Sequence, residues 1–123
     1  MRYLTDRKRA EGKGPSGTGT EHHWYMTVSA VSLAFMVPAV VIVFGRALGR
    51  DRAGVIETFA NPFVAILTAL VLVVSMLHFW RGAQNMILDY WKGSLRYGLI
   101  MLAISLAYLV MAVGLYALAR IAL

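Results

Sequence analysis

Long apolar stretches alternate with short polar segments along this chain of 123 residues. Three stretches contain no Asp, Glu, Lys or Arg, and they cover residues 24–45, 58–80 and 97–119. A helix of about 20 apolar residues crosses a hydrocarbon core of roughly 30 Å. A helix also satisfies its backbone hydrogen bonds within one segment, as lipid requires. The pattern therefore predicts an all-α membrane protein with three transmembrane helices, which form a three-helix anchor over residues 22–123.

Two prolines and two loops refine this picture. Pro38 lies inside the first span and predicts a kink or a local break, whereas Pro62 falls in the first turns of the second span, where proline is better tolerated. Residues 46–57 are interpreted as a simple connector. Gly114 in the third span is a candidate for close helix contact.

Composition and charge support a membrane protein rather than a soluble one. The chain is 59% hydrophobic and 15% charged, whereas soluble domains have about 25% charged residues. Residues 1–21 form a basic arm whose Gly, Ser, Thr and Pro content favours irregular structure. No apolar segment in this arm precedes a small-residue cleavage site, so no secretory signal peptide is expected.

The distribution of the 12 Lys and Arg residues predicts the orientation of the chain. If the N-terminus is cytoplasmic, eight cations lie on the cytoplasmic side (Arg2, Arg7, Lys8, Arg9, Lys13, Arg81, Lys92, Arg96) and four lie opposite (Arg46, Arg50, Arg52, Arg120). The positive-inside rule then places the N-terminus in the cytoplasm and the C-terminus in the periplasm. The net charge of +6 reflects this topology and contact with acidic lipid, and no nucleic-acid site is expected.

The stretch from His78 to Trp91, HFWRGAQNMILDYW, carries the candidate chemistry. At about 3.6 residues per turn, His78, Gly82, Asn85 and Asp89 share one face if the helix continues past the span. We expect it to continue by two turns, to about residue 86. Ionisable groups inside a membrane are costly, so such a stripe is a functional candidate.

Several kinds of chemistry are excluded within this chain. It has no cysteine, so it offers no thiolate ligands for an iron–sulfur cluster and no attachment site for c-type haem. It also lacks the Walker, Gly-x-Ser-x-Gly and His-Glu-x-x-His motifs, so the sequence shows no set of catalytic residues for hydrolysis.

His78 has two interpretations from the residues alone. A neutral imidazole is a good axial ligand for haem iron, and Gly82 one turn later would leave room for the macrocycle. Alternatively, His78 forms a hydrogen bond to a neighbouring helix. A six-coordinate haem needs a second ligand, and His22, His23 and a partner chain are the possible sources; we favour the partner, since three spans enclose a macrocycle poorly.

Asp89 and Tyr90 point to a quinone. A tyrosine hydroxyl can donate a hydrogen bond to a quinone carbonyl, and a neighbouring carboxylate can orient that group and take part in proton delivery. The alternative is an interfacial tyrosine beside a solvated aspartate.

The pattern His78-x-Trp80-x-Gly82 followed by Asp89-Tyr90 resembles the small hydrophobic membrane anchor of succinate dehydrogenase, respiratory complex II. The stretches YLTDRKRAEGKG and GTEHHWYMTVSA resemble the alphaproteobacterial branch of that family. The resemblance covers nearly the whole chain.

This resemblance implies a role in a complex of four subunits in the bacterial cytoplasmic membrane, whose flavoprotein oxidises succinate and whose iron–sulfur subunit transfers the electrons. The chain and a second membrane anchor, the cytochrome b partner, would share haem b and reduce ubiquinone. His78 would be one axial ligand, and the cytochrome b partner would supply the other. Tyr90 would hydrogen-bond the quinone beside Asp89. The chain would have no catalytic activity by itself.

One departure from the family pattern affects the start of the first span. Some members have an arginine in an Arg-x-Thr-Ala pattern, whereas this chain reads Thr27-Val28-Ser29-Ala30. Contacts of that arginine must be absent or supplied elsewhere. His22 and His23 are candidates as pocket or haem-propionate neighbours, and solvated interfacial histidines are the other interpretation.

Three other functions compete with this interpretation. A related quinol:fumarate reductase anchor would differ in the quinone used. A small proton-coupled transporter would need a charged residue near the middle of a span, and the three stretches contain none. A purely structural membrane protein would leave the His78 to Tyr90 spacing unexplained.

Overall fold

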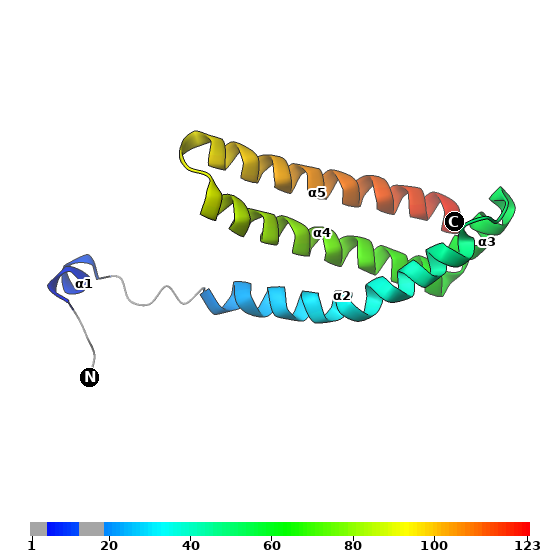
Figure 1. Ribbon diagram of the computed structural model, residues 1–123, viewed down its shortest axis with the longest axis horizontal. Helices are drawn as coiled ribbons and strands as arrows, with labels where there is room; N and C mark the ends of the chain where they lie inside the picture. The colour runs from blue at the N-terminus through cyan, green and yellow to red at the C-terminus, as the bar shows by residue number, and fades with distance from the viewer. Residues whose placement is uncertain (1–4, 13–18) are drawn as a thin grey trace.

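The computed structural model describes residues 5–12 and 19–123. The helices in these residues are α1 (Asp6–Glu11), α2 (Gly19–Ala47), α3 (Arg52–Ala60), α4 (Pro62–Tyr90) and α5 (Gly93–Ala122), and they are the only regular structure there (Figure 1). The prediction of an all-α fold is confirmed.

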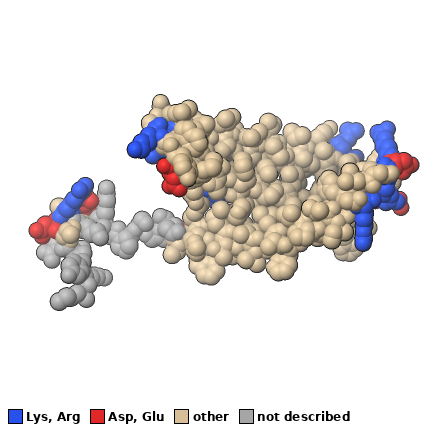
Figure 2. All heavy atoms as spheres, in the orientation of Figure 1, with Lys and Arg blue, Asp and Glu red and all other residues tan. Residues whose placement is uncertain are grey.

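Three of these helices are long and apolar enough to cross a membrane: α2 over Thr20–Ala47, α4 and α5. Figure 2 shows the charged side chains gathered at the two ends of the helix bundle, with a broad uncharged band between them. Large apolar side chains on this band point outward; Phe35, for example, is 77% exposed. This arrangement suits lipid, which solvates apolar surface that water would not.

Helix α4 is the central element, since it packs against α2 on one side and α5 on the other (Figure 1). Gly114 of α5 faces α4 so closely that an added Cβ would lie 2.5 Å from Cδ2 of Leu72. The expected role of Gly114 in close helix contact is confirmed.

The start of the second span differs from the sequence prediction. The second span starts at Pro62 instead of residue 58, because Asn61 ends α3 and caps α4. The side chain of Asn61 accepts hydrogen bonds from the backbone N–H groups of Phe63 and Val64 at 3.0 and 3.4 Å, which satisfies two of the free donors of the first turn. Pro62 at the first helical position needs no such bond.

The segment interpreted as a simple connector contains the start of α3. Asp51 caps this helix by accepting a hydrogen bond from Gly54 N at 3.0 Å. Its Phe59 is buried and meets Phe44 of α2 edge to face, with ring centroids 5.0 Å apart. This segment was interpreted as a loop because it is short and contains two glycines. The helix cap and the aromatic contact order part of it as a helix.

Pro38 bends the first span without breaking it. Helix α2 is continuous through this proline, and Figure 1 shows its axis changing direction part-way along. This outcome matches the kink, rather than the break, that the sequence allowed.

The N-terminal arm is only partly described. Asp6–Glu11 form the short helix α1, in which Arg7 pairs with Glu11 at 2.9 Å. The sequence favoured irregular structure here, so that expectation is wrong for these six residues. Arg2, Lys13 and most of the Gly- and Ser-rich stretch lie outside the described residues.

Candidate functional site

The polar stripe lies on α4, which extends past the expected end at about residue 86, and it packs against α2. Helix α4 continues to Tyr90, so the stripe from His78 to Asp89 lies on one helix. Three successive positions of the stripe meet three positions of α2. Nδ1 of His78 lies 2.8 Å from the hydroxyl of Ser29, and Nδ2 of Asn85 lies 3.0 Å from Nε2 of His22.

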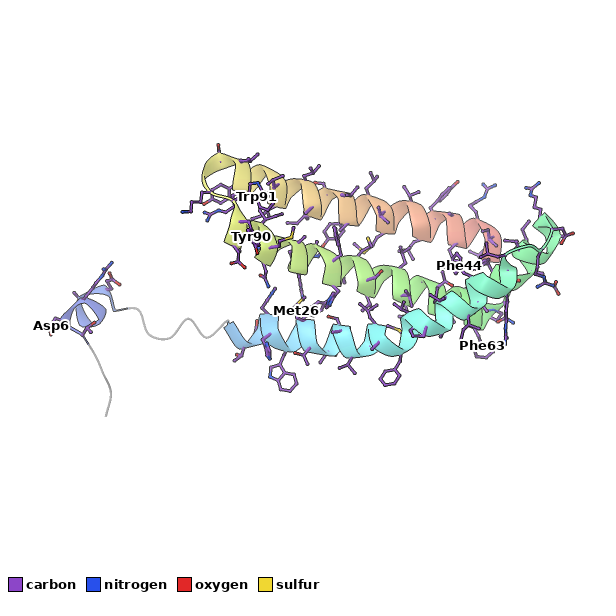
Figure 3. The ribbon with its side chains drawn as sticks, in the orientation of Figure 1. Asp6, Met26, Phe44, Phe63, Tyr90 and Trp91 are labelled. Atoms are coloured by element: carbon purple, nitrogen blue, oxygen red, sulfur yellow. The ribbon has the colours of Figure 1, made fainter. Side chains whose placement is uncertain are left out.

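Gly82 makes the middle contact of this stripe. A Cβ added to Gly82 would lie 3.7 Å from Cε of Met26, which is ordinary van der Waals contact. Figure 3 places Met26 between α2 and α4. The room at Gly82 is therefore occupied by a methionine of the same chain, which is unbranched and can adopt several conformations.

Ser29 is the buried member of the pair with His78. It is 5% exposed and is the only buried polar residue among the described residues, whereas His78 is half-buried. The Ser29 hydroxyl also lies 2.7 Å from the carbonyl oxygen of Tyr25 and 3.1 Å from that of Met26. Within the described chain, Nε2 of His78 has no hydrogen-bond partner.

The two N-terminal histidines differ in their surroundings. His22 is half-buried and bonded to Asn85, whereas His23 is exposed and its side chain makes no hydrogen bond within the described residues. His22 faces a position seven residues along α4 from His78, roughly 10 Å at 1.5 Å per residue. Metal–nitrogen bonds are about 2 Å long. His22 is thus too far along the bundle to share an iron with His78 in this arrangement.

Asp89 and Tyr90 lie at the exposed end of α4. Tyr90 is 79% exposed, and Figure 3 shows it beside Trp91 at the opposite end of the bundle from Phe63. The two rings are 6.3 Å apart, and the Tyr90 hydroxyl has no hydrogen-bond partner among the described residues. The Asp89 carboxylate lies in the last turn of α4, where the helix dipole disfavours negative charge. Both polar groups are free to meet a ligand or a partner chain.

A cation beside the stripe was not singled out from the sequence. The guanidinium of Arg81 lies 3.5 Å from the ring centroid of Tyr25 and 5.4 Å from that of Trp80. The Trp80 Nε1 atom is buried without a hydrogen-bond partner. Arg81 was interpreted only as a topology signal, yet it also ties α4 to α2.

Ser29, Tyr25 and Met26 were also missed as site residues. A weak signal was present: His22, Met26 and Ser29 are spaced four and three residues apart, so they share one face of α2, as His78, Gly82 and Asn85 share one face of α4.

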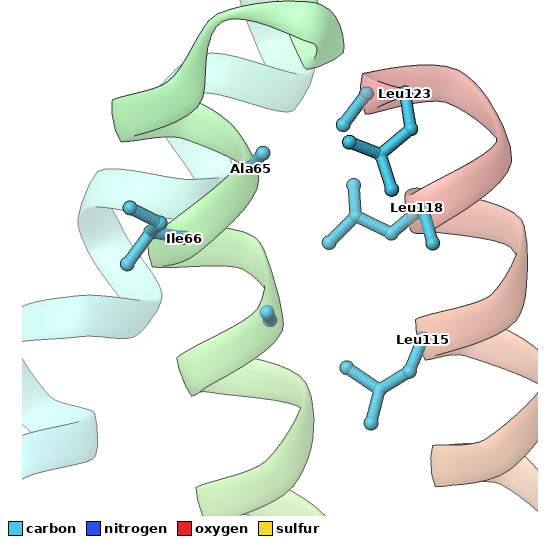
Figure 4. Close-up of a pocket in the computed structure, with 8 residues that line it drawn as sticks. Ala65, Ile66, Leu115, Leu118 and Leu123 are labelled. Carbon is cyan, nitrogen blue, oxygen red and sulfur yellow. The ribbon is translucent and has the colours of Figure 1, made fainter.

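A hollow lies at the other end of the bundle, between α4 and α5 (Figure 4). Its lining is apolar throughout and consists of Ala65, Ile66, Ala69, Leu115, Leu118, Ala119, Ala122 and Leu123. It offers no group that could bind a polar ligand or carry out chemistry.

The described residues contain no cluster of three or more His, Cys, Asp or Glu side chains suited to a metal ion. Any metal held at His78 would therefore take its other ligands from a cofactor or another chain.

Comparison with known proteins adds the family. Residues 1–114 match the model of the succinate dehydrogenase/fumarate reductase transmembrane subunit. The chain is also 45% identical over 123 residues to the succinate dehydrogenase hydrophobic membrane anchor subunit of Paracoccus denitrificans. This alignment covers 100% of the present chain and 95% of the Paracoccus protein. The chain belongs to the succinate dehydrogenase/fumarate reductase transmembrane-subunit family. No solved structure matches it.

Membership of this family is consistent with the described residues, which show no set of catalytic side chains. A transmembrane subunit of succinate dehydrogenase or fumarate reductase is part of an oxidoreductase complex and is not itself the catalytic subunit. The resemblance derived from His78, Trp80, Gly82, Asp89 and Tyr90 is confirmed at the level of the family.

Proposed function

We propose that this chain is the membrane anchor of a succinate:ubiquinone oxidoreductase. It holds half of a haem b site and part of the ubiquinone site, and it docks a flavoprotein and an iron–sulfur subunit to the membrane. The observation that carries the proposal is one helix, α4, with a half-buried imidazole in the span and an exposed Asp-Tyr pair three turns later. The 45% identity to the Paracoccus anchor favours succinate dehydrogenase over fumarate reductase.

The residues around His78 suit a haem ligand. The Nδ1 atom bonds to Ser29, and Nε2 is left without a partner in the described chain. In metal-bound histidines, one ring nitrogen typically binds the metal while the other makes a hydrogen bond that orients the ring. A haem bound there would supply a one-electron redox centre within the membrane.

The second axial ligand is expected from the cytochrome b partner. Within this chain, His22 lies opposite Asn85 and not opposite His78. Gly82 would let the macrocycle approach α4, provided that Met26 moves aside from its contact with that glycine. His22, and with less support His23, would be polar neighbours of the haem edge.

Tyr90 and Asp89 suit the ubiquinone head group. The exposed Tyr90 hydroxyl can donate a hydrogen bond to a quinone carbonyl, and Asp89 can hold a water or a proton beside it. Both lie where α4 leaves its apolar span, at a boundary that a lipid-soluble quinone and aqueous protons can both reach. The iron–sulfur subunit and the cytochrome b partner would complete the pocket.

The proposed orientation places this quinone end at the cytoplasmic face of the bacterial inner membrane. The N-terminus and the α4–α5 turn lie on that side, with eight of the 12 cations, and the C-terminus is periplasmic.

The decisive experiment is an oxidised-minus-reduced optical spectrum of the tagged chain purified with its partners in mild detergent. We expect the bands of a bis-imidazole b-type haem together with succinate-reducible flavin and iron–sulfur subunits. His78→Ala should abolish or strongly perturb the haem bands. A chain that purifies alone and colourless would refute the proposal, and an unaltered haem in His78→Ala would remove His78 as the ligand.

A further inference from the structure

The hydroxyl of Ser29 joins α2 to α4 through a partly buried hydrogen bond. Its oxygen lies 2.8 Å from Nδ1 of His78, 49 residues away in the sequence. Burying a hydroxyl costs free energy unless it is hydrogen-bonded. Among the described residues, Ser29 is the only polar residue that is buried as a whole, so its place opposite the histidine needs an explanation.

The neighbours of Ser29 indicate the direction of this hydrogen bond. The hydroxyl has one proton, and the carbonyl oxygen of Tyr25 at 2.7 Å can only accept. Other hydroxyls of α2 donate to the carbonyl four residues earlier, as Ser32 does to Val28 at 2.8 Å and Thr27 does to His23 at 3.0 Å. If Ser29 donates in the same way, its oxygen must accept from His78, whose proton is then on Nδ1.

We infer that Ser29 is a positioning residue that holds His78 in the Nδ1–H tautomer and directs the lone pair of Nε2 toward haem iron. This inference rests on the proposed function, because it assigns Ser29 to the same haem site. A hydrogen bond from Nδ1–H fixes the orientation of the ring and raises the basicity of the metal-binding nitrogen. A more basic ligand stabilises the oxidised iron, so Ser29 lowers the haem reduction potential.

Ser29 variants in the intact complex test this inference. Ser29→Ala removes the acceptor, and Ser29→Cys keeps nearly the same shape with a weak acceptor. We expect haem retention to fall about 10- to 100-fold for Ser29→Ala, the usual loss for an outer partner of a metal ligand. The haem potential should rise, and the EPR g values of the oxidised haem should shift. Ser29→Thr, which keeps the hydroxyl, should restore the wild-type values.

Ser32→Ala is the matched control. Ser32 lies about one turn further along α2 and makes the same kind of backbone hydrogen bond, but among the described residues it forms no hydrogen bond to a histidine. It should leave haem retention, potential and g values unchanged.

The outcomes separate this inference from the proposed function. Loss of haem in His78→Ala, with wild-type potential, g values and retention in Ser29→Ala, would overturn the role of Ser29 and leave the proposed function standing. Lower thermal stability of Ser29→Ala with an unchanged potential would likewise overturn it and make Ser29 a helix-docking residue only. A haem that survives His78→Ala would overturn both.

Discussion

The side-chain amide of Asn85 lies 3.0 Å from Nε2 of His22, which links the start of α2 to the last turns of α4. Together with the bond between His78 and Ser29, it holds the two helices at fixed register on either side of the Gly82–Met26 contact. The proposed haem ligand and the proposed quinone residues lie on the same helix, so α4 itself fixes the position of one relative to the other.

The first prediction is that His22 and Asn85 act as a coupled pair. His22→Ala and Asn85→Ala should each lower the thermal stability of the purified complex, and the double variant should lose little more than either single one. Since the hydrogen bond is exposed, we expect a coupling near the lower end of about 0.5–1.5 kcal/mol. The double-mutant cycle measures this value, and His23→Ala at the neighbouring exposed position is the control. Strictly additive losses would show that the two side chains do not interact.

The second prediction concerns the hydroxyl of Tyr90. Tyr90→Phe keeps the ring beside Trp91 and removes only the donor. Losing one such hydrogen bond of about 0.5–1.5 kcal/mol should slow ubiquinone reduction roughly 2- to 10-fold. Succinate oxidation with an artificial dye acceptor should continue at the wild-type rate, because it does not use this site. Tyr108→Phe, at another exposed tyrosine in α5, is the matched control. An equal loss in both assays would instead indicate misassembly.

The third prediction separates function from stability at Asp89. A carboxylate in the last turn of α4 opposes the helix dipole, and no basic residue in that turn offsets it. Asp89→Asn should therefore leave the complex equally stable or stabilise it by about 0.3–1 kcal/mol. If Asp89 assists proton delivery, the same variant should slow quinone reduction while the haem spectrum stays unchanged.

Two assays on the same preparation check the Asp89 prediction: thermal unfolding and quinone reductase turnover. Glu57→Gln, at an exposed carboxylate in α3 near the other end of the bundle, controls for loss of charge. Wild-type turnover over the whole pH range in Asp89→Asn would make this carboxylate a bystander.

The sequence predicted the parts of this molecule that depend on one helix at a time. Hydrophobic periodicity and charge located three spans, and helical geometry placed His78, Gly82, Asn85 and Asp89 on one face, as α4 has them. What faces this stripe depends on the register between α2 and α4, which no local pattern fixes. For that reason Ser29 passed as an ordinary small residue of a span, and the separate surroundings of His22 and His23 were not foreseen.

The ends of the spans were harder to predict for a related reason. Asn61 and Asp51 are polar residues that look like loop residues in the sequence, yet each caps a helix. The break between α3 and α4 depends on these side-chain hydrogen bonds and on Pro62, whereas hydropathy alone places the start of the second span in α3.

The last prediction tests the packing of α4 against α5. A Cβ at Gly114 would lie 2.5 Å from Leu72 Cδ2, so a side chain there forces Leu72 to move. Replacing a helical glycine by alanine should by itself gain about 1 kcal/mol in helix propensity. Gly98→Ala measures that gain alone, because nothing lies within 4 Å of a Cβ built on Gly98.

At Gly114 the crowding should offset this gain, so Gly114→Ala should be less stable than Gly98→Ala in thermal unfolding of the complex. Gly114→Val should cost about 1–3 kcal/mol, the usual range for overpacking. Because the obstructing atoms belong to one flexible side chain, Leu72→Ala should recover part of this loss when combined with Gly114→Val. If Gly114→Ala and Gly98→Ala were stabilising to the same extent, α5 would not approach α4 closely at this glycine.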